Sequence, residues 1–470
     1  MSKSNNRKYD VAVIGAGISG LICACYLAKA GMKVLLIEQH DKPGGYFTSF
    51  KRGKLLFDAA AHSFGNYRQG GHVNKILTEL GVNKIINIKR FDPSDIVITP
   101  DFDITFWNDL ESTIGGLVQT FPHEQQGIIS FFNFLTASKQ SEFSKLRNKN
   151  FLSLLQSFIN DDRLINALAF PVLGNGGLPP SLMHAFSGSK IFSEFLIDGG
   201  YYPEGGIQHL PNALAHIITQ NRGEILYRRK VERIICDRDS VAGVVLDKNE
   251  SCASKYVVSA CDMTQTFRTF LGEEAVGAQT MSALNKMQPS VSTLILYIGI
   301  DDAFNGLPHP GTNVWYLPYY DLDNIYNQGQ LCNFAATGFM LRVSPDKKTI
   351  VAFTGAPFRT ADFWRQNKQV IAKNFLNRIA ERIPELKNHI VYFDAATPAT
   401  LYRYTLNDSG AAFGWAKTPS QTFESIYNRT TPIPGLYLTG HWTSIAFELP
   451  GTCYTGYDTA QRILRKEKKS

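Results

Sequence analysis

A glycine-rich turn near residue 15, set between a short apolar strand and a helix, is the feature that most constrains the fold. Residues 11–14 are Val-Ala-Val-Ile, and Gly15, Gly17 and Gly20 follow them in the spacing G-x-G-x-x-G. Apolar residues from Leu21 onward recur at helical spacing. The segment therefore predicts a strand, a tight turn and a helix, the opening unit of a doubly wound α/β domain.

The turn also predicts a dinucleotide site. Gly15 permits the tight turn, Gly17 lets the backbone approach a pyrophosphate, and Gly20 lets the helix pack on the strand. A second strand is expected over residues 33–38 and ends at Glu38, where a carboxylate can accept from a ribose hydroxyl and disfavours the 2′-phosphate of NADP. The dinucleotide-binding residues predicted here are Gly15, Ala16, Gly17, Ile18, Ser19, Gly20 and Glu38.

A second glycine pair distinguishes FAD from NAD. Gly44 and Gly45 come shortly after the second strand and are followed by Tyr46. Backbone without side chains can lie against the far half of a longer dinucleotide, which NAD dehydrogenases seldom need. We therefore predict that Gly44, Gly45 and Tyr46 belong to an FAD site.

The composition excludes several classes of protein. With 470 residues, 44% of them hydrophobic, the chain has ample core for two or three domains. Its net charge of +7 comes from scattered positive residues, so no nucleic acid partner is expected. The seven cysteines include no C-x-x-C pair, so we predict no disulfide framework, no metal and a reducing compartment. Because the N-terminus is polar and no 18 apolar residues run together, we expect a cytoplasmic protein, at most peripheral on the inner face of a membrane.

Residues from about 100 to 200 are rich in Phe, Leu and Lys and predict an inserted substrate region. Aromatic residues make up 12% of the chain and charged residues 19%, which favours a large apolar cavity or an apolar face. Five apolar residues of the insertion fall on one helical stripe: Phe151, Leu152, Leu155, Phe158 and Ile159. The stripe fits either core packing or an entrance helix that lies on a membrane.

Further apolar segments indicate that the chain crosses repeatedly between two domains. Strands are expected at residues 223–227, 231–235 and 435–440 and a buried strand at residues 255–262, whereas residues 290–299 alternate differently and predict a mixed sheet. The predicted fold is α/β, with a Rossmann-like FAD-binding domain and an interleaved α+β substrate domain that contains the mixed sheet. The FAD-binding domain is expected over residues 1–100, 200–285 and 400–470, and the substrate-binding domain over residues 101–199 and 286–399.

Five motifs together resemble one flavoprotein family. They are residues 13–21 (VIGAGISGL), Gly44-Gly45, residues 202–206 (YPEGG), residues 410–415 (GAAFGW) and residues 436–440 (LYLTG). Over nearly its whole length the chain resembles the FAD-dependent phytoene desaturases of bacterial type, carotenoid isomerases and retinol saturases, within the wider amine-oxidase-like flavoproteins. The motifs at the two ends of the chain carry most of the resemblance.

The resemblance implies how FAD is held. The pyrophosphate would lie on the glycine turn, the adenosine ribose at Glu38 and the adenine against the backbone of Val231. Gly44-Gly45 would run toward the ribityl chain. The residues implied near the flavin itself are Gly440, His441 and Pro450.

The sequence departs from the family pattern at two places near the flavin. His441 stands where many relatives have an acid, and residues 445–448 (IAFE) stand where relatives have a Pro-Gly-x-Gly turn. Losing those glycines adds bulk near the flavin ring. We therefore expect a substrate pocket shaped unlike that of a carotene desaturase.

The resemblance implies an FAD-dependent oxidoreductase that acts on C–C bonds of a long apolar chain, with a carotenoid or other isoprenoid as the first substrate. Removing hydrogen from such a chain needs a base within hydrogen-bond reach, and the candidates are Glu448, His441 and His62. Each has a plainer alternative: His62 caps a loop, His441 only contacts the ribityl chain, or Glu448 faces solvent.

Three other functions stay open at this point. In the first, the substrate is an acyl or polyketide chain carried on another protein. In the second, the substrate is an amine, since the many aromatic residues suit an amine oxidase. A third alternative is a flavin-free protein of the same fold that binds prenyl lipids. Because a polyene is poorly soluble, peripheral contact with a membrane is a further expectation.

Overall fold

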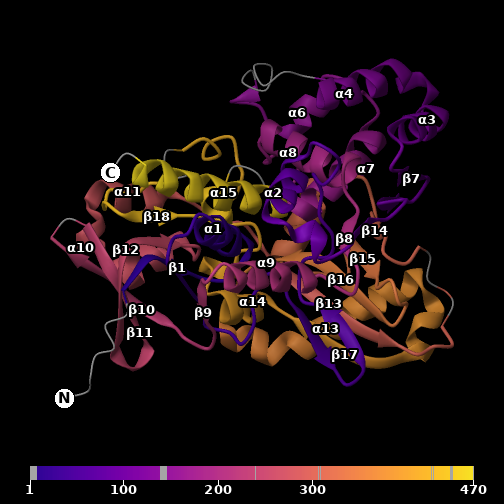
Figure 1. Ribbon diagram of the computed structural model, residues 1–470. Helices are drawn as coiled ribbons and strands as arrows, with labels where there is room; N and C mark the ends of the chain where they lie inside the picture. Colours follow the sequence, from indigo (N-terminus) through magenta and orange to yellow (C-terminus); the bar gives the residue numbers. More distant parts are fainter. Residues whose placement is uncertain are drawn as a thin grey trace.

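The structure is a computed structural model that describes residues 8–137, 146–238, 240–304, 306, 309–424, 426, 428–444 and 448–468. Two seven-stranded sheets organise it, one on each side of the molecule in Figure 1. A group of helices from residues 110–191 covers the upper end of the second sheet in the same view. The chain passes several times between the two sheets, as the sequence predicts.

The first sheet contains the glycine-rich turn. Its order is β10-β11-β12-β1-β2-β9, and β18 pairs with β12 off this path. At the centre of this sheet, all three strand pairs are parallel: β18 with β12, β12 with β1, and β1 with β2. This is the arrangement of a doubly wound domain. The strand bounds are β1 Lys8–Ile14, β2 Val34–Ile37, β9 Glu224–Leu226, β10 Val231–Asp237, β11 Ser240–Leu246, β12 Glu250–Ser259 and β18 Leu436–Leu438.

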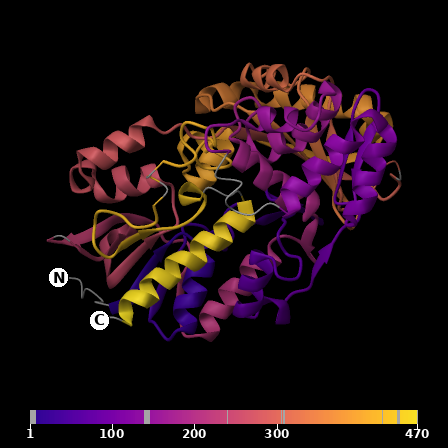
Figure 2. The ribbon, with the colours of Figure 1, turned by 90° about the horizontal axis from the view of Figure 1, so that it is seen from above.

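Three helices pack on this sheet: α1 Ile18–Lys29, α9 His209–Gln220 and α15 Glu448–Glu467. Helix α15 lies alongside α1, as the view from above shows (Figure 2). The contact is close because Gly456 has no side chain, and a Cβ there would lie 2.5 Å from the carbonyl oxygen of Ser19. The first and last parts of the described chain therefore form one layer.

The second sheet is mixed, as predicted for residues 290–299. Its order is β17-β13-β16-β15-β14-β6-β7; β14 and β6 are parallel, and the other neighbours are antiparallel. Strand β6 belongs to this sheet, although the expected domain boundary at residue 100 assigns it to the FAD-binding domain. The strand bounds are β6 Asp95–Ile98, β7 Asp103–Phe106, β13 Ser292–Ile300, β14 Asn313–Tyr316, β15 Phe339–Val343, β16 Thr349–Ala356 and β17 Ile390–Ala396.

The aromatic-rich insertion forms the helical group beside the second sheet. Of the predicted stripe, Phe151, Leu155 and Ile159 are buried in one hydrophobic core, and Leu152 and Phe158 pack against it. Core packing is therefore the confirmed interpretation of this stripe. The helices of this group are α3 Leu110–Thr120, α4 Gln125–Ala137, α6 Phe151–Gln156, α7 Asp162–Gly176 and α8 Ala185–Ile191.

The remaining elements connect the two sheets. The hairpin strands are β3 Ser49–Arg52 and β4 Leu55–Asp58, with β5 Ile88–Arg90 paired to β8 Tyr201–Pro203. The remaining α-helices are α2 His72–Leu80, α10 Glu273–Val276, α11 Ala278–Lys286, α12 Leu322–Gln330, α13 Ala361–Arg382 and α14 Pro398–Thr405. In the part of the chain that the structure describes, no helix combines the length and hydropathy needed to cross a bilayer.

Candidate functional site

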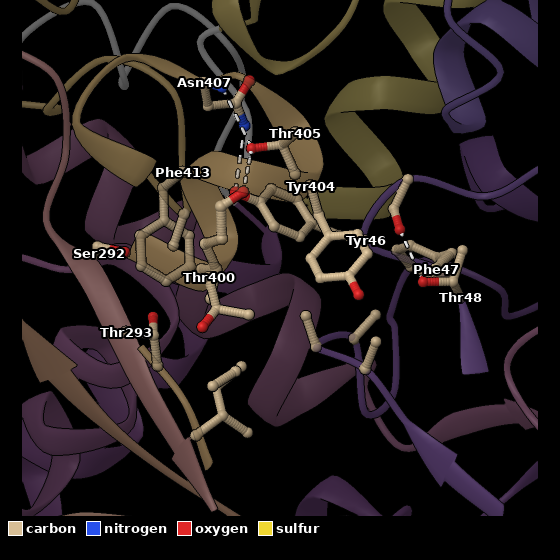
Figure 3. Close-up of a pocket in the computed structure, with 18 of the residues that line it drawn as sticks. Tyr46, Phe47, Thr48, Ser292, Thr293, Thr400, Tyr404, Thr405, Asn407 and Phe413 are labelled. Carbon is tan, nitrogen blue, oxygen red and sulfur yellow. Dashed lines mark hydrogen bonds between the residues drawn. The ribbon is translucent and has the colours of Figure 1, made fainter. Parts of the chain in front are cut away.

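A cavity of about 600 Å³ runs between the two sheets. One part of its wall is the turn between β1 and α1, and the opposite part is formed by strands of the second sheet. Figure 3 shows its middle region, where Tyr46 and Tyr404 lie on one side and Phe413 and Ser292 on the other. The cavity therefore joins the predicted dinucleotide site to the predicted substrate domain.

The glycine turn has the geometry that its spacing predicts. Gly15 has φ +95°, a left-handed conformation that favours glycine. A Cβ on Gly20 would lie 2.1 Å from the carbonyl oxygen of Gly15, so only glycine allows α1 to pack on the turn. Gly17 has nothing within 4 Å of a Cβ position and lines the cavity, which leaves its backbone accessible to a ligand.

Glu38 lies directly beside this turn, just after β2. Its side chain is 8% exposed and lines the cavity. The carboxylate accepts hydrogen bonds from the backbone N–H of Ala16 at 2.8 Å and of His40 at 2.9 Å. These two donors hold the carboxylate at the cavity wall, with lone pairs left to accept from a ligand hydroxyl.

The second glycine pair lies against the first turn. The N–H of Gly44 donates to the carbonyl of Ala16 at 2.8 Å, and both glycines have positive φ, +135° at Gly44 and +60° at Gly45. A Cβ on Gly44 would lie 2.6 Å from the carbonyl oxygen of Phe47. The pair therefore forms a stretch of cavity wall made of backbone.

These features fit an extended dinucleotide. Val231 lines the cavity at the end near Glu38, and Gly440 and His441 line it beyond the glycine turns. Gly440 has φ +108° and follows β18, and its N–H donates to Thr455 Oγ1 at 3.1 Å. Val231, Glu38, the two glycine turns, Gly440 and His441 thus all line one cavity. Ala16, Gly20 and Pro450, the other predicted cofactor residues, are buried behind the wall and support it rather than line it.

Tyr46 forms part of the wall between the glycine turns and the second sheet. Its hydroxyl donates to the carbonyl of Ala411 at 2.8 Å and accepts from Asn407 Nδ2 at 3.1 Å. Its ring lies 6.1 Å from that of His441, centroid to centroid. The predicted residues Tyr46 and His441 are therefore neighbours, although they are far apart in the sequence.

His441 lies in an environment that opposes its protonation. Burial and the positive charge of Lys417 lower the pKa of His441 to about 3. Burial also lowers the pKa of Lys417 to about 7, while its ammonium donates to the carbonyl of Ser444 at 2.6 Å. Neutral His441 is therefore the form present near neutral pH.

Glu448 lines the cavity, but it does not lie in a loop as expected. It is the first residue of α15 and has φ +42°, and its neighbours 445–447 lie outside the described residues. Burial raises the pKa of Glu448 to about 8. Of the three predicted acid–base candidates, Glu448 is thus the one whose pKa lies near physiological pH.

His62, the third candidate, lies on the same cavity wall. Its Nδ1 atom is 3.1 Å from Asn313 Oδ1 and 3.2 Å from Ser63 Oγ. Burial and the charge of Arg342 lower the pKa of His62 to about 3. The structure therefore brings all three candidates to one cavity, and two of them are weak bases there.

The part of the cavity on the second sheet is strongly apolar. Its side chains come from α7, α12 and the strands β14, β15 and β16. They are Phe170, Leu173, Trp315, Ile325, Tyr326, Phe339, Met340 and Phe353. A wall of this kind accommodates a long apolar ligand.

Two buried polar features of the site carry no recognisable signal in the sequence. Lys417 is 1% exposed and lies two residues after a motif that carries the family resemblance. Asp95, Asn313 and Arg342 form a cluster behind His62, and they come from three different strands. No local pattern marks such residues, because only strand pairing brings them together.

Comparison with known proteins identifies a family over almost the whole chain. The family described as flavin containing amine oxidoreductase matches residues 18–464. This match confirms the predicted flavin cofactor, FAD, and the predicted enzyme class of oxidoreductase.

Three curated relatives are similar over more than nine tenths of this chain. All-trans-retinol 13,14-reductase of Danio rerio is 25% identical over 92% of this chain and 82% of its own. Prolycopene isomerase, chloroplastic, of Daucus carota is 24% identical over 99% and 82%. Phytoene desaturase (lycopene-forming) of Pseudescherichia vulneris is 25% identical over 96% and 98%. These similarities confirm the predicted family resemblance.

Solved structures confirm the fold. An oxidoreductase from Methanosarcina mazei has a TM-score of 0.68 and 18% identity, and the match covers 97% of this chain and all of that one. Putrescine oxidase bound to putrescine has a TM-score of 0.67 and 15% identity, over 98% of this chain and 100% of that one. At these identities the likeness concerns the arrangement of the two domains and not the substrate.

Proposed function

The chain belongs to the flavin-containing amine oxidoreductase family, and from that premise we propose that it acts on carbon–carbon bonds of a long apolar polyene or isoprenoid chain. The reaction is a desaturation, a saturation or an isomerisation. Relatives named for each of these three reactions match nearly the whole chain. The substrate class is shared among them, whereas the direction of the redox step is not.

The apolar wall of the cavity is the observation that carries this proposal. Eight apolar and aromatic side chains line the part of the cavity on the second sheet, and this part is continuous with the dinucleotide site. An apolar chain buried there gains about 0.8 kcal/mol per CH₂. A wall of this composition selects for apolar substrates and excludes water from the reacting bond.

We propose that FAD lies along the backbone wall described above. Glu38 would accept from the adenosine ribose, Gly15 and Gly17 would face the pyrophosphate, and Gly44 and Gly45 would accompany the ribityl chain. FAD, when bound there, supplies the two-electron carrier for the reaction. The protein supplies orientation, exclusion of water and the proton.

Glu448 is the residue we propose as acid or base. A general acid or base works best when its pKa lies near the operating pH, and the pKa of Glu448 is raised to about 8. His441 and His62, with pKa values of about 3, are almost entirely unprotonated near pH 7. In the proposed reaction, the Glu448 carboxyl takes a proton from the substrate carbon or returns one to it.

The test is a product analysis that covers all three reaction directions. The FAD-loaded protein is incubated with all-trans-retinol, phytoene or prolycopene, once with oxidised flavin and a quinone and once with reduced flavin. Mass spectrometry then distinguishes loss of two hydrogens, gain of two hydrogens and an unchanged mass with a new retention time. No change of any polyene in either redox state, together with flavin reduction by aliphatic amines, would refute the proposal.

Amine oxidation is the second candidate reaction. The specific observation in its favour is the likeness of the fold to putrescine oxidase. A protonated amine must be desolvated to enter the apolar wall described above, and burying an unpaired charge is expensive. An acyl or polyketide chain held on a carrier protein is apolar and fits this wall. Thioester analogues of such a chain are therefore included in the same product analysis.

We also propose that the protein takes its substrate from a membrane surface. The cavity wall reaches the protein surface at Gly355, Arg403 and Tyr404, whose side chains or backbone are exposed. Tyr404 is 54% exposed, and the guanidinium of Arg403 lies over its ring at 4.9 Å. This opening is where an apolar chain would enter.

Exposed apolar side chains are close along the chain to these cavity-lining residues. Phe358 and Tyr402 are 40% and 45% exposed, and their rings are 5.7 Å apart. Leu331, 70% exposed, follows a cavity-lining residue at the end of α12, and Arg359 donates to the backbone there. We call Leu331, Phe358, Tyr402 and Tyr404 the entrance rim. Apolar side chains with neighbouring arginines suit the interface of an anionic bilayer.

A further inference from the structure

A buried polar cluster lies directly behind His62 and fixes how its ring is protonated. Asp95 and Asn313 face each other across the parallel pair β6 and β14, and Asn313 Nδ2 donates to Asp95 Oδ1 at 3.0 Å. Arg342 on β15 donates from Nη1 to Asn313 Oδ1 at 3.2 Å. Asp95 accepts only, once ionised, and Arg342 donates only. These two partners therefore determine which end of the Asn313 amide faces His62.

The oxygen of Asn313 is the atom that faces His62. Oδ1 lies 3.1 Å from His62 Nδ1, and an amide oxygen can only accept. The contact is a hydrogen bond only if Nδ1 carries the proton. The alternative is that Ser63 donates to an unprotonated Nδ1. The Nδ1 lone pair and the Asn313 oxygen, both acceptors, would then face each other at 3.1 Å and repel. Neutral His62 is thus the Nδ1–H tautomer, and Nε2 carries the lone pair.

The cluster is held rigidly. Asp95 Oδ1 also accepts from the indole Nε1 of Trp315 at 2.8 Å, so one carboxylate orients both a wall residue of the cavity and, through Asn313, His62. Arg342 is 5% exposed, and its guanidinium lies over the ring of Tyr202 at 4.8 Å. Because Arg342 is a buried cation, it also disfavours a second positive charge on the imidazole.

We propose that Nε2 of His62 accepts a hydrogen bond from a hydroxyl group of the substrate, so that the preferred substrate is a polyene or isoprenoid alcohol rather than a pure hydrocarbon. His62 lines both the main cavity and a smaller neighbouring cavity of about 180 Å³. Among the described residues, no group is hydrogen-bonded to Nε2. A neutral acceptor in a largely apolar wall selects ligands that bring a donor to it.

This inference rests on the proposed function and names the substrate class more closely. The test compares all-trans-retinol with its O-methyl ether, which keeps the polyene and the oxygen but has no hydroxyl donor. Binding to the FAD-loaded protein is measured by quenching of tryptophan fluorescence. We expect the alcohol to bind about tenfold more tightly than the ether, which corresponds to about 1.4 kcal/mol.

Variants separate His62 from nonspecific effects. His62→Phe keeps an aromatic ring without an acceptor, and we expect it to remove the preference for the alcohol while the ether binds as before. Asn313→Leu releases the tautomer and should weaken the preference while leaving His62 in place. His216→Phe, at an exposed position on α9, is the matched control and should keep the preference.

The outcomes distinguish the two proposals. Equal binding of alcohol and ether by the unmodified protein overturns the hydroxyl site and leaves the proposed function standing. Binding of neither ligand also overturns this inference, and the proposed function falls with it only if the product analysis with phytoene and prolycopene shows no change either. The tautomer is checked independently by long-range ¹H–¹⁵N spectra of histidine-labelled protein at neutral pH. Assignment of the proton to Nε2 of His62, even with a correctly folded protein, would also overturn the inference.

Discussion

Replacing Glu448 by glutamine tests the acid–base proposal and the burial of this carboxyl together. The pKa of Glu448 is raised from 4.5 to about 8 because the carboxyl is buried at the cavity wall. A carboxyl with a raised pKa is favourable for the folded state while it is protonated. That contribution is complete below the unfolded pKa of 4.5 and is lost as the pH rises through about 8.

The size of the loss follows from the shift in pKa. One pKa unit corresponds to about 1.36 kcal/mol, so the full shift corresponds to about 5 kcal/mol at most. Because the cavity admits water when no ligand fills it, we expect about half of this, about 2–3 kcal/mol, between pH 5 and pH 8. Glutamine has no such dependence. The Glu448→Gln protein should therefore become more stable than wild type as the pH rises.

The assay is thermal unfolding of the cofactor-free protein from pH 5 to pH 9. For a chain of 470 residues, 2–3 kcal/mol corresponds to a difference in Tm of about 2–3 °C. This difference should appear near pH 8, level off above it, and vanish near pH 5. Parallel Tm profiles for wild type and variant would refute the reasoning, because they would show an ordinary, solvated carboxylate.

The same variant should bind FAD normally but react slowly. Loss of a general acid or base typically costs 10²–10⁴ in rate, which stopped-flow flavin spectra measure. Glu194→Gln is the matched control, because burial raises the pKa of Glu194 to about 7 and this residue does not line the main cavity. It should shift the stability profile and leave the rate unchanged. A wild-type rate in Glu448→Gln would move the proposed role to His441 or His62.

Three further predictions concern the cofactor and the membrane. Gly17→Val should weaken FAD binding more than Glu38→Ala does, because the valine side chain would occupy space at the cavity wall. For Glu38→Ala, loss of a hydrogen bond to a charged group costs about 1.5–3 kcal/mol. Affinities are measured by fluorescence titration, and unchanged affinities in both variants would contradict the proposed site. Acid or heat should release all of the flavin as free FAD, and flavin that stays with the precipitated chain would show a covalent bond. In flotation assays with anionic liposomes at low salt, the double variant Phe358→Ser and Tyr402→Ser should lose binding while the control Trp107→Ser keeps it; equal flotation of both variants would place the contact elsewhere.

The first fifty residues could be predicted in detail because their structure is set locally. The spacing of the glycines fixes a turn, the apolar run before it fixes a buried strand, and Glu38 directly follows the next strand, beside that turn. The same holds for β18, where apolar residues end at Gly440. Each of these predictions depends on residues within one strand, turn and helix.

The surroundings of His62 could not be predicted, because they depend on pairing between distant strands. Asp95 and Asn313 are 218 residues apart and meet through the parallel register of β6 and β14. Neither residue belongs to a periodic pattern or a motif in the sequence. Burial of Lys417 is likewise a property of the assembled domains, since a lysine side chain is usually exposed.

The pairing of α1 with α15 has a consequence for how the protein is made. Gly15 and Gly440 line the same cavity, but 424 residues are synthesised between them. At about 5–20 residues per second, the ribosome needs roughly 20–90 s to add this length. During that time α15 has not been synthesised, so the face of α1 that packs against it stays uncovered. The nascent chain is therefore exposed to aggregation until α15 is available, and cells that lack chaperone capacity should yield the protein mainly as insoluble material.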